Sequence, residues 1–340
     1  MRERGIISKE LLDSFELQGI NRRDFLKYCA ATAALFGLSE LEVTTKLAYA
    51  LEPTSKKPPV LWLEGLACAG CTISLAQSLY PPVASLILDK ISLRSHWTLM
   101  AGAGEVAEDV LNATIKQGGY ILIFEGAIPS ADDRFWTHAG ATGRHHFEEA
   151  AKKATSVIAV GACSAYGGIP RATPSKGISV SEALKNAKIK KPVINISTCP
   201  VHPDHLVGTI LYVLMTGKIP ELDSNGRPAM YFGDNRLLHD NCRRRAHFDA
   251  GEFLNDWNDP KQKDWCLFQK GCKGPLVHID CAIRRWNDGI NFCLDCGGLC
   301  QACGDPGFYD KMTPLYTAES EASRRIWAMR EAGQFSRDES

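Results

Sequence analysis

Residues 58–79 read PPVLWLEGLACAGCTISLAQSL, an apolar run followed by two closely spaced cysteines and then by an amphipathic stretch. Residues 58–63 have the length and composition of a buried β-strand, and residues 72–79 have the pattern of a helix. Cys68 and Cys71 therefore fall in the loop between a strand and the helix that follows it. In a parallel α/β sheet this loop lies at the carboxyl edge, where ligands bind.

The alternation of strand and helix continues to residue 216, which predicts an α/β domain with a doubly wound parallel sheet over residues 51–216. Further strands are expected at the apolar runs 91–94, 120–124, 156–160 and 192–196. The helices between them are expected at residues 105–116, 147–153, 179–186 and 204–215.

Two further cysteines follow predicted strands of this sheet. Cys163 comes after the apolar run 157–161, and Cys199 comes after 193–196. The glycines and prolines around both indicate loops, although either cysteine alone could be a small buried core residue. Because the carboxyl ends of parallel strands share one edge, we expect four thiols to converge there and to suit an iron–sulfur cluster: Cys68, Cys71, Cys163 and Cys199.

After Gly217 the alternation fades and the chain becomes polar and rich in cysteine, which predicts a second, irregular domain over residues 217–315, stabilised by metal ligation. Its candidate ligands form two sets. One set is His239, Cys242, Cys266 and Cys272, and the other is Cys281, Cys293, Cys296, Cys300 and Cys303. The C-x-x-C pairs are compatible with both zinc and iron–sulfur clusters.

Residues 1–50 predict a twin-arginine signal for export to the periplasm, outside the mature fold. Asn21-Arg22-Arg23-Asp24-Phe25-Leu26-Lys27 precedes a short apolar stretch, and Ala48-Tyr49-Ala50 provides a cleavage site. Cys29 lies within the signal, so we expect it to be lost from the 13 cysteines of the chain. Disulfides are common in oxidising compartments, but a chain long enough to build its own cores does not need them, and the paired spacing favours chelation.

Charge and hydropathy argue against a nucleic-acid-binding, lipid-binding or membrane-spanning protein. The 39 Lys and Arg residues balance the 39 Asp and Glu residues, so no polybasic surface for nucleic acid or anionic lipid is predicted. No segment after the signal has the length of a transmembrane helix, and residues 316–340 form a charged C-terminal tail.

Taken together, these motifs resemble the small, electron-transferring subunit of periplasmic nickel–iron hydrogenases. The resemblance rests on the export signal, the strand that leads into Cys68 and Cys71, and the motifs at residues 161–168, 199–204, 239–247, 272–275, 285–289 and 303–308. It implies a flavodoxin-like domain with a proximal 4Fe–4S cluster, followed by a small irregular domain with a medial and a distal cluster. The nickel–iron centre of that family lies in a separate large subunit, so no catalytic residue is expected in this chain.

The resemblance also implies the ligands of each cluster. They are Cys68, Cys71, Cys163 and Cys199 for the proximal cluster, His239, Cys242, Cys266 and Cys272 for the distal 4Fe–4S cluster, and Cys281, Cys293, Cys300 and Cys303 for the medial cluster. The common family pattern has proline at the position of Cys293 and a 3Fe–4S medial cluster. The additional thiolate here predicts a medial 4Fe–4S cluster, with 3Fe–4S as the alternative. Cys296 is a further thiol that could compete as a ligand, pack as a small residue or sense redox state.

By the same resemblance, electrons from H2 oxidation pass through the three clusters to a periplasmic cytochrome c or to a membrane-anchoring subunit. Two other interpretations remain open at this point. A quinone-reductase-type iron–sulfur subunit would share the first domain but would lack both the export signal and the second cysteine-rich domain. A zinc-stapled binding module would explain the C-x-x-C pairs without redox activity.

Overall fold

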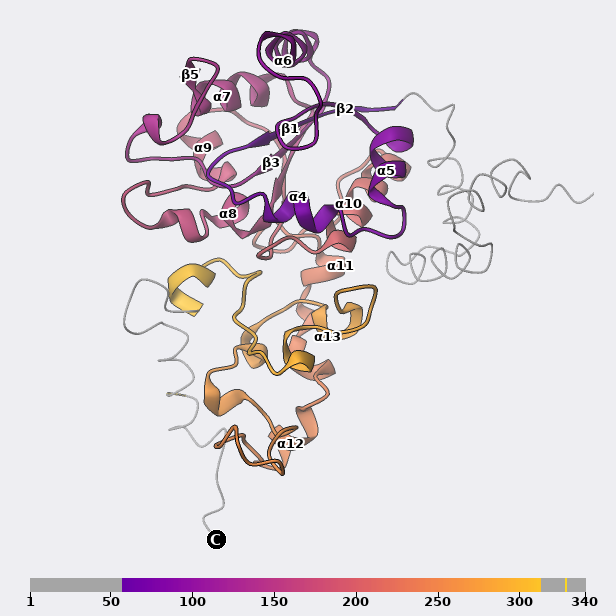
Figure 1. The fold of residues 1–340 in the computed structure, drawn as a ribbon, viewed down its shortest axis with the longest axis vertical. Coiled ribbons are helices and arrows are strands. Elements are labelled where there is room, and N and C mark those ends of the chain that lie inside the picture. Colours follow the sequence, from indigo (N-terminus) through magenta and orange to yellow (C-terminus); the bar gives the residue numbers. More distant parts are fainter. Residues whose placement is uncertain (1–56, 313–327, 329–340) are drawn as a thin grey trace, which may run out of the picture.

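The computed structural model describes residues 57–312 and residue 328. The predicted export signal, and the predicted tail apart from residue 328, lie outside the described residues. Figure 1 shows an α/β part drawn in indigo to rose and, beneath it, an irregular part drawn in orange and yellow. The predicted domain boundary after residue 216 stays a prediction.

Five parallel strands form the main sheet, in the order β2–β1–β3–β6–β7. The strands are β1 (Pro59–Glu64), β2 (Ser92–His96), β3 (Ile121–Glu125), β6 (Ser156–Val160) and β7 (Val193–Ile196). This is the strand order of flavodoxin-like folds, and it reverses between β1 and β3, which makes the carboxyl edge there a ligand-binding crevice. The predicted α/β class is therefore confirmed, and every predicted strand is present within two residues at each end.

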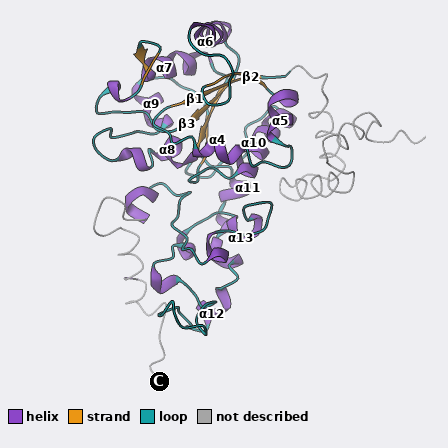
Figure 2. Cartoon of the chain, viewed as in Figure 1, coloured by secondary structure: helices purple, strands orange, loops and turns teal. Residues whose placement is uncertain are grey.

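Helices cover both faces of the sheet (Figure 2). Because side chains alternate along a strand, Trp62 packs with one buried cluster and Leu61 and Leu63 pack with the other. The first face is covered by α4 (Gly70–Leu75), α5 (Val83–Ser85), the π-turn η1 (Leu86–Lys90) and α10 (Pro203–Thr216). The second face is covered by α6 (Glu105–Gln117), α7 (Gly143–Lys153) and α9 (Val180–Asn186).

Two local predictions at the carboxyl edge were wrong. The segment expected to be a loop after β6 forms the short helix α8 (Gly161–Tyr166), and Cys71 lies in the first turn of α4 instead of in the preceding loop. Glycines at both ends of α8, Gly161 and Gly167, take positive φ angles of 84° and 90°. Because glycine is typical of loops, the composition of this short helix predicted a loop instead. A short hairpin, β4 (Thr137–His138) and β5 (Ala141–Thr142), was also not predicted.

Residues 217–312 form short helical turns and isolated bridges, with no paired strand in this described stretch. Its turns are α11 (Ala229–Phe232), η4 (Asp234–Arg236), η5 (Leu238–Asn241), α12 (Arg245–Asp249), η6 (Phe268–Lys270), η7 (Gly274–Leu276), α13 (Cys281–Arg284), η8 (Cys293–Cys296) and η9 (Phe308–Met312). Its core combines aromatic and aliphatic side chains with the cysteines Cys242, Cys272 and Cys300. The expected irregular, cysteine-rich architecture is therefore present.

Candidate functional site

The first group of thiols lies at the carboxyl edge of the sheet. Cys68 and Cys71 follow β1, Cys163 lies in α8 directly after β6, and Cys199 follows β7. In Figure 1, α4 and α8 lie on the side of the α/β part that faces the orange and yellow part. The predicted convergence of these strand ends therefore places the thiols beside the irregular part of the chain.

These thiols are close enough to affect one another's ionisation. Burial raises the pKa of Cys163 to about 12, and the neighbouring Cys199 and Cys68 sulfurs contribute to the rise. Burial also raises the pKa of Cys71, with contributions from Glu125, Cys163 and Cys199. Because a metal cation stabilises thiolates directly, a cluster of iron would remove the cost of ionising this group, and the donor set fits one.

Glycines make room for the sulfur atoms. A Cβ atom added to Gly161 would lie 2.6 Å from Sγ of Cys71, and one added to Gly168 would lie 2.8 Å from Sγ of Cys163. Both glycines also have positive φ, at 84° and 51°. The backbone N–H of Val201 donates a hydrogen bond to Sγ of Cys71 at 3.3 Å. Hydrogen bonds to ligand sulfurs change the reduction potential of a bound cluster.

Sequence reasoning missed a buried carboxylate beside this group. Glu125 ends β3, is only 2 % exposed, and accepts hydrogen bonds from the Cys71 N–H at 3.1 Å and the Thr72 hydroxyl at 2.6 Å. The Thr72 hydroxyl lies 3.3 Å from His96 Nε2, and His96 Nδ1 lies 3.2 Å from a carboxylate oxygen of Glu64. Burial raises the pKa of Glu125. The signal in the sequence was a glutamate at the last position of an apolar strand.

The second group contains Cys242, Cys266 and Cys272, with His239 on η5. Burial raises the pKa of Cys266 to about 12, and the Cys272 and Cys242 sulfurs add to the rise. His239 is 6 % exposed, and its buried Nε2 has no hydrogen-bond partner among the described residues. Burial lowers the pKa of this imidazole, which favours the neutral form that binds metals. An unpaired buried nitrogen is costly, and metal coordination would satisfy it.

The third group surrounds a cavity of about 640 Å³ at the junction of the two parts. Cys281, Cys293, Cys296, Cys300 and Cys303 all line this cavity, together with Cys199 of the first group. Burial raises the pKa of Cys303 to about 12, and the Cys293 and Cys199 sulfurs contribute. Burial raises the pKa of Cys300 as well, with Cys272, Cys303 and Cys281 adding to it.

These contacts place the third group between the other two. Cys303 neighbours Cys199 of the first group, and the Cys199 backbone N–H donates to its sulfur. Cys300 neighbours Cys272 of the second group, and the backbone of Cys300 accepts from the Lys273 N–H at 2.8 Å. The third group therefore lies between the first group, at the sheet edge, and the second group, in the irregular part.

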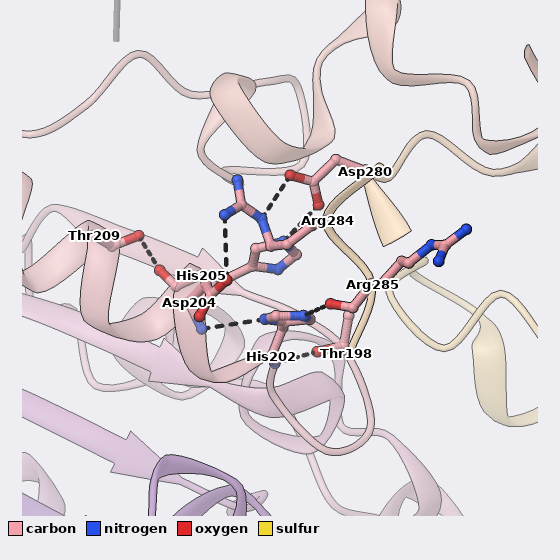
Figure 3. A network of polar contacts seen from close by, with 8 residues as sticks. All are labelled: Thr198, His202, Asp204, His205, Thr209, Asp280, Arg284 and Arg285. Atoms are coloured by element: carbon pink, nitrogen blue, oxygen red, sulfur yellow. Dashed lines mark hydrogen bonds and ion pairs between the residues drawn. The ribbon is translucent and has the colours of Figure 1, made fainter. Parts of the chain in front are cut away.

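A buried polar network links α10 to the residues that flank Cys281 of the third group (Figure 3). His205 Nε2 lies 2.7 Å from Asp280 Oδ1, and Arg284 Nε donates to Asp280 Oδ2 at 2.9 Å. Although burial alone would raise it, these two partners hold the pKa of Asp280 at about 2. His202 Nε2 donates to the carbonyl of Arg285 at 2.5 Å. Because α13 begins at Cys281, the network holds that cysteine from both sides.

Within residues 57–312 and 328, no three His, Cys, Asp or Glu side chains are grouped closely enough to hold a single metal ion. The cysteine ligands of a four-iron cluster lie further apart than those of one ion, because iron and sulfide stand between them. In the part of the chain that the structure describes, no helix is both long and apolar enough to cross a membrane.

Comparison with known proteins identifies the family. The model of the C-terminal region of the "NiFe/NiFeSe hydrogenase small subunit" matches residues 235–316. The periplasmic NiFeSe hydrogenase small subunit of Desulfomicrobium baculatum is 38% identical over 323 residues, which cover 88% of this chain and 99% of the relative. This chain belongs to the family of NiFe/NiFeSe hydrogenase small subunits. The periplasmic NiFe hydrogenase small subunit of Solidesulfovibrio fructosivorans is also similar to this small subunit, with 41% identity over 88% of this chain and 93% of the relative.

Solved structures agree with this assignment. The reduced, active NiFeSe hydrogenase from Desulfomicrobium baculatum matches this small subunit with a TM-score of 0.71 and 38% identity, over 78% of this chain and all of the other. The description "NADH ubiquinone oxidoreductase, 20 Kd subunit" matches residues 68–213. This match covers the α/β part alone, which is the domain that a quinone-reductase-type subunit was expected to share. It does not extend to the irregular part of the small subunit.

Proposed function

We propose that this small subunit relays electrons one at a time through three iron–sulfur clusters, between a nickel–iron centre on a hydrogenase large subunit and an external acceptor. The observation that carries the proposal is the linear order of the thiol groups. Cys303 of the third group neighbours Cys199 of the first, and Cys300 of the third neighbours Cys272 of the second. Clusters held by these groups would form a chain, in which each centre has a near neighbour to receive its electron.

Each group has a donor set that fits a cluster. The first group would bind the proximal 4Fe–4S cluster, the third the medial cluster, and the second the distal 4Fe–4S cluster. When bound, a cluster supplies a site that accepts and returns one electron. The ligands are proposed to be Cys68, Cys71, Cys163 and Cys199 for the proximal cluster, Cys281, Cys293, Cys300 and Cys303 for the medial cluster, and His239, Cys242, Cys266 and Cys272 for the distal cluster.

The residues of this chain would tune the relay through burial, hydrogen bonds and ligand charge. Val201 donates a hydrogen bond to the Cys71 sulfur, and the Cys199 backbone N–H donates to the Cys303 sulfur. A neutral His239 in place of a thiolate would leave the distal cluster less negative and raise its reduction potential. A higher reduction potential at the distal cluster favours electron transfer toward that cluster, from which electrons would leave the subunit.

The medial cluster is proposed to be 4Fe–4S, because Cys293 provides a fourth thiol. Cys293 is a neighbour of both Cys281 and Cys303, whose pKa values are raised mainly by burial and further by the Cys293 sulfur. All three line the same cavity with Cys300. A four-iron medial cluster would have a lower potential than a three-iron one.

We further propose that the chain is exported to the periplasm by its twin-arginine signal and forms a heterodimer with a hydrogenase large subunit. Relatives from Desulfomicrobium baculatum and Solidesulfovibrio fructosivorans are named as periplasmic small subunits. The acceptor would be a periplasmic cytochrome c or a membrane-anchoring subunit.

Metal and sulfide analysis of the purified heterodimer tests this proposal. We expect iron and acid-labile sulfide in equal amounts, no stoichiometric zinc, and loss of iron–sulfur absorbance when H2 is added. Zinc in place of iron would support the zinc-stapled binding module instead. If H2 does not reduce the iron–sulfur clusters, the clusters do not receive electrons from H2 oxidation, and the proposed relay is wrong.

A further inference from the structure

The turn η8 carries two cysteines on the same side of the chain. Residues 293–296 form a 3₁₀ helix, which has three residues per turn, so that side chains at positions i and i+3 are eclipsed. Cys293 and Cys296 therefore project in one direction, separated by a rise of roughly 6 Å along the axis. Their sulfurs are neighbours, since burial raises the pKa of Cys293 and the Cys296 sulfur contributes to the rise.

The two residues between them anchor the turn to the irregular part. Leu294 is 3 % exposed and belongs to the buried core of the irregular part. Asp295 forms ion pairs with Arg243 at 3.0 Å and Arg285 at 3.7 Å. Cys293 and Cys296 both border the cavity of the third group, and Leu294 between them borders it as well.

The cavity is therefore lined by more thiols than a four-iron cluster needs. Cys281, Cys300 and Cys303 are set by their own segments, and Cys293 neighbours two of them. Cys296 lines the same cavity and is exposed. Its role is therefore not that of a small apolar residue packed in the core. Its place one turn along from Cys293 matches that of a second thiol able to reach the same iron.

We propose that Cys296 is a reserve ligand of the medial cluster, which binds the fourth iron when Cys293 is absent or displaced. This inference rests on the proposed function, because it assumes that the third group holds a four-iron cluster. When Cys293 is displaced, a bond from Cys296 Sγ to iron would form, the Cys293–iron bond would break, and the proton lost by the Cys296 thiol would pass through solvent to the Cys293 thiolate that leaves. The exchange of one thiolate for another changes no oxidation state.

Three variants of the intact heterodimer test the proposal: C293A, C296A and C293A/C296A. The readouts are the EPR spectrum of the oxidised protein, which reveals a three-iron cluster directly, and the iron content per chain. We expect C293A and C296A to keep the wild-type iron content without a three-iron signal. The double variant is expected to show that signal and to lose one iron per chain.

A full three-iron signal in C293A alone would overturn the proposal, because Cys296 would then have failed to take the iron. A double variant that keeps all its iron would also overturn it, since some other group would be the reserve ligand. A three-iron signal in the unaltered protein would instead refute the four-iron medial cluster of the proposed function. If C293A does not accumulate, C293V, which has a side chain of similar size and no ligand atom, is measured with the same criteria.

Discussion

Replacement of Asp280 by alanine should loosen the junction between the α/β part and the third thiol group. The Asp280 and His205 side chains are 3% and 0% exposed, and Asp280 also pairs with Arg284. In the D280A variant His205 would remain buried without its carboxylate, whereas Arg284, which is 19% exposed, would keep its pair with Asp204 at 3.4 Å. Removal of one member of a buried pair costs about 3–5 kcal/mol. Because Arg284 keeps its position over the Tyr231 ring at 5.1 Å, the lower end of this range applies.

The pKa of Asp280 provides a second measure of the same interaction. Its shift from 3.8 to about 2 corresponds to about 2 kcal/mol of stability. The folded-state pKa is depressed, so this contribution is fully present above the unfolded pKa and is lost as pH falls toward the folded value. Across neutral pH the effect of the substitution should therefore be constant.

A loss of about 2–3 kcal/mol should lower the Tm of the metal-loaded heterodimer by roughly 4–10 °C. The assay is differential scanning fluorimetry with the visible iron–sulfur absorbance followed in parallel. D280N keeps an oxygen that accepts from His205 Nε2, so about half of the drop is expected. E149A, which removes the exposed pair between Glu149 and Lys152, is the control and should change Tm by less than roughly 2 °C. A D280A variant as stable as E149A would refute the argument.

Three other changes probe the thiol groups. G161A should empty the proximal site, because the new Cβ would meet the Cys71 sulfur at 2.6 Å, whereas G140A has the same positive-φ strain and nothing within 4 Å; iron content that falls equally in both variants would contradict this reason. H239C should retain the distal cluster at a lower potential, because a thiolate adds negative charge, and a redox titration with an unchanged distal potential would argue against His239 as a ligand. Removal of iron by a chelator should expose residues 217–312 to trypsin before the sheet, because thiols form part of that core, and simultaneous cleavage of both parts would count against it.

The strands could be predicted closely because each is an apolar run bounded by turn residues, and their parallel order follows from the helices between them. The same reasoning placed Cys163 and Cys199 at the edge shared with Cys68 and Cys71. The prediction of a loop at α8 was wrong. Position 161 must be glycine because it lies close to the Cys71 sulfur, and composition alone reads that glycine as a sign of a loop.

The arrangement of the thiol groups relative to one another could not be predicted from spacing. Cys303 and Cys199 are distant in sequence, and the contact between them depends on how the irregular part docks on the sheet. The pair of His205 and Asp280, which secures that docking, spans 75 residues. No local pattern in either segment specifies its partner. Glu125 was missed for a similar reason, since its hydrogen-bond donors lie on α4 after a different strand.

The proposed relay depends on three clusters that follow one another, with the medial one between the other two. EPR of the intact heterodimer during a redox titration under H2 tests it most directly. We expect no three-iron signal in the oxidised protein, reduction of every cluster by H2, and magnetic coupling of the medial cluster to both of its neighbours. A medial cluster that couples to only one neighbour, or iron that H2 cannot reduce, would contradict the proposed relay.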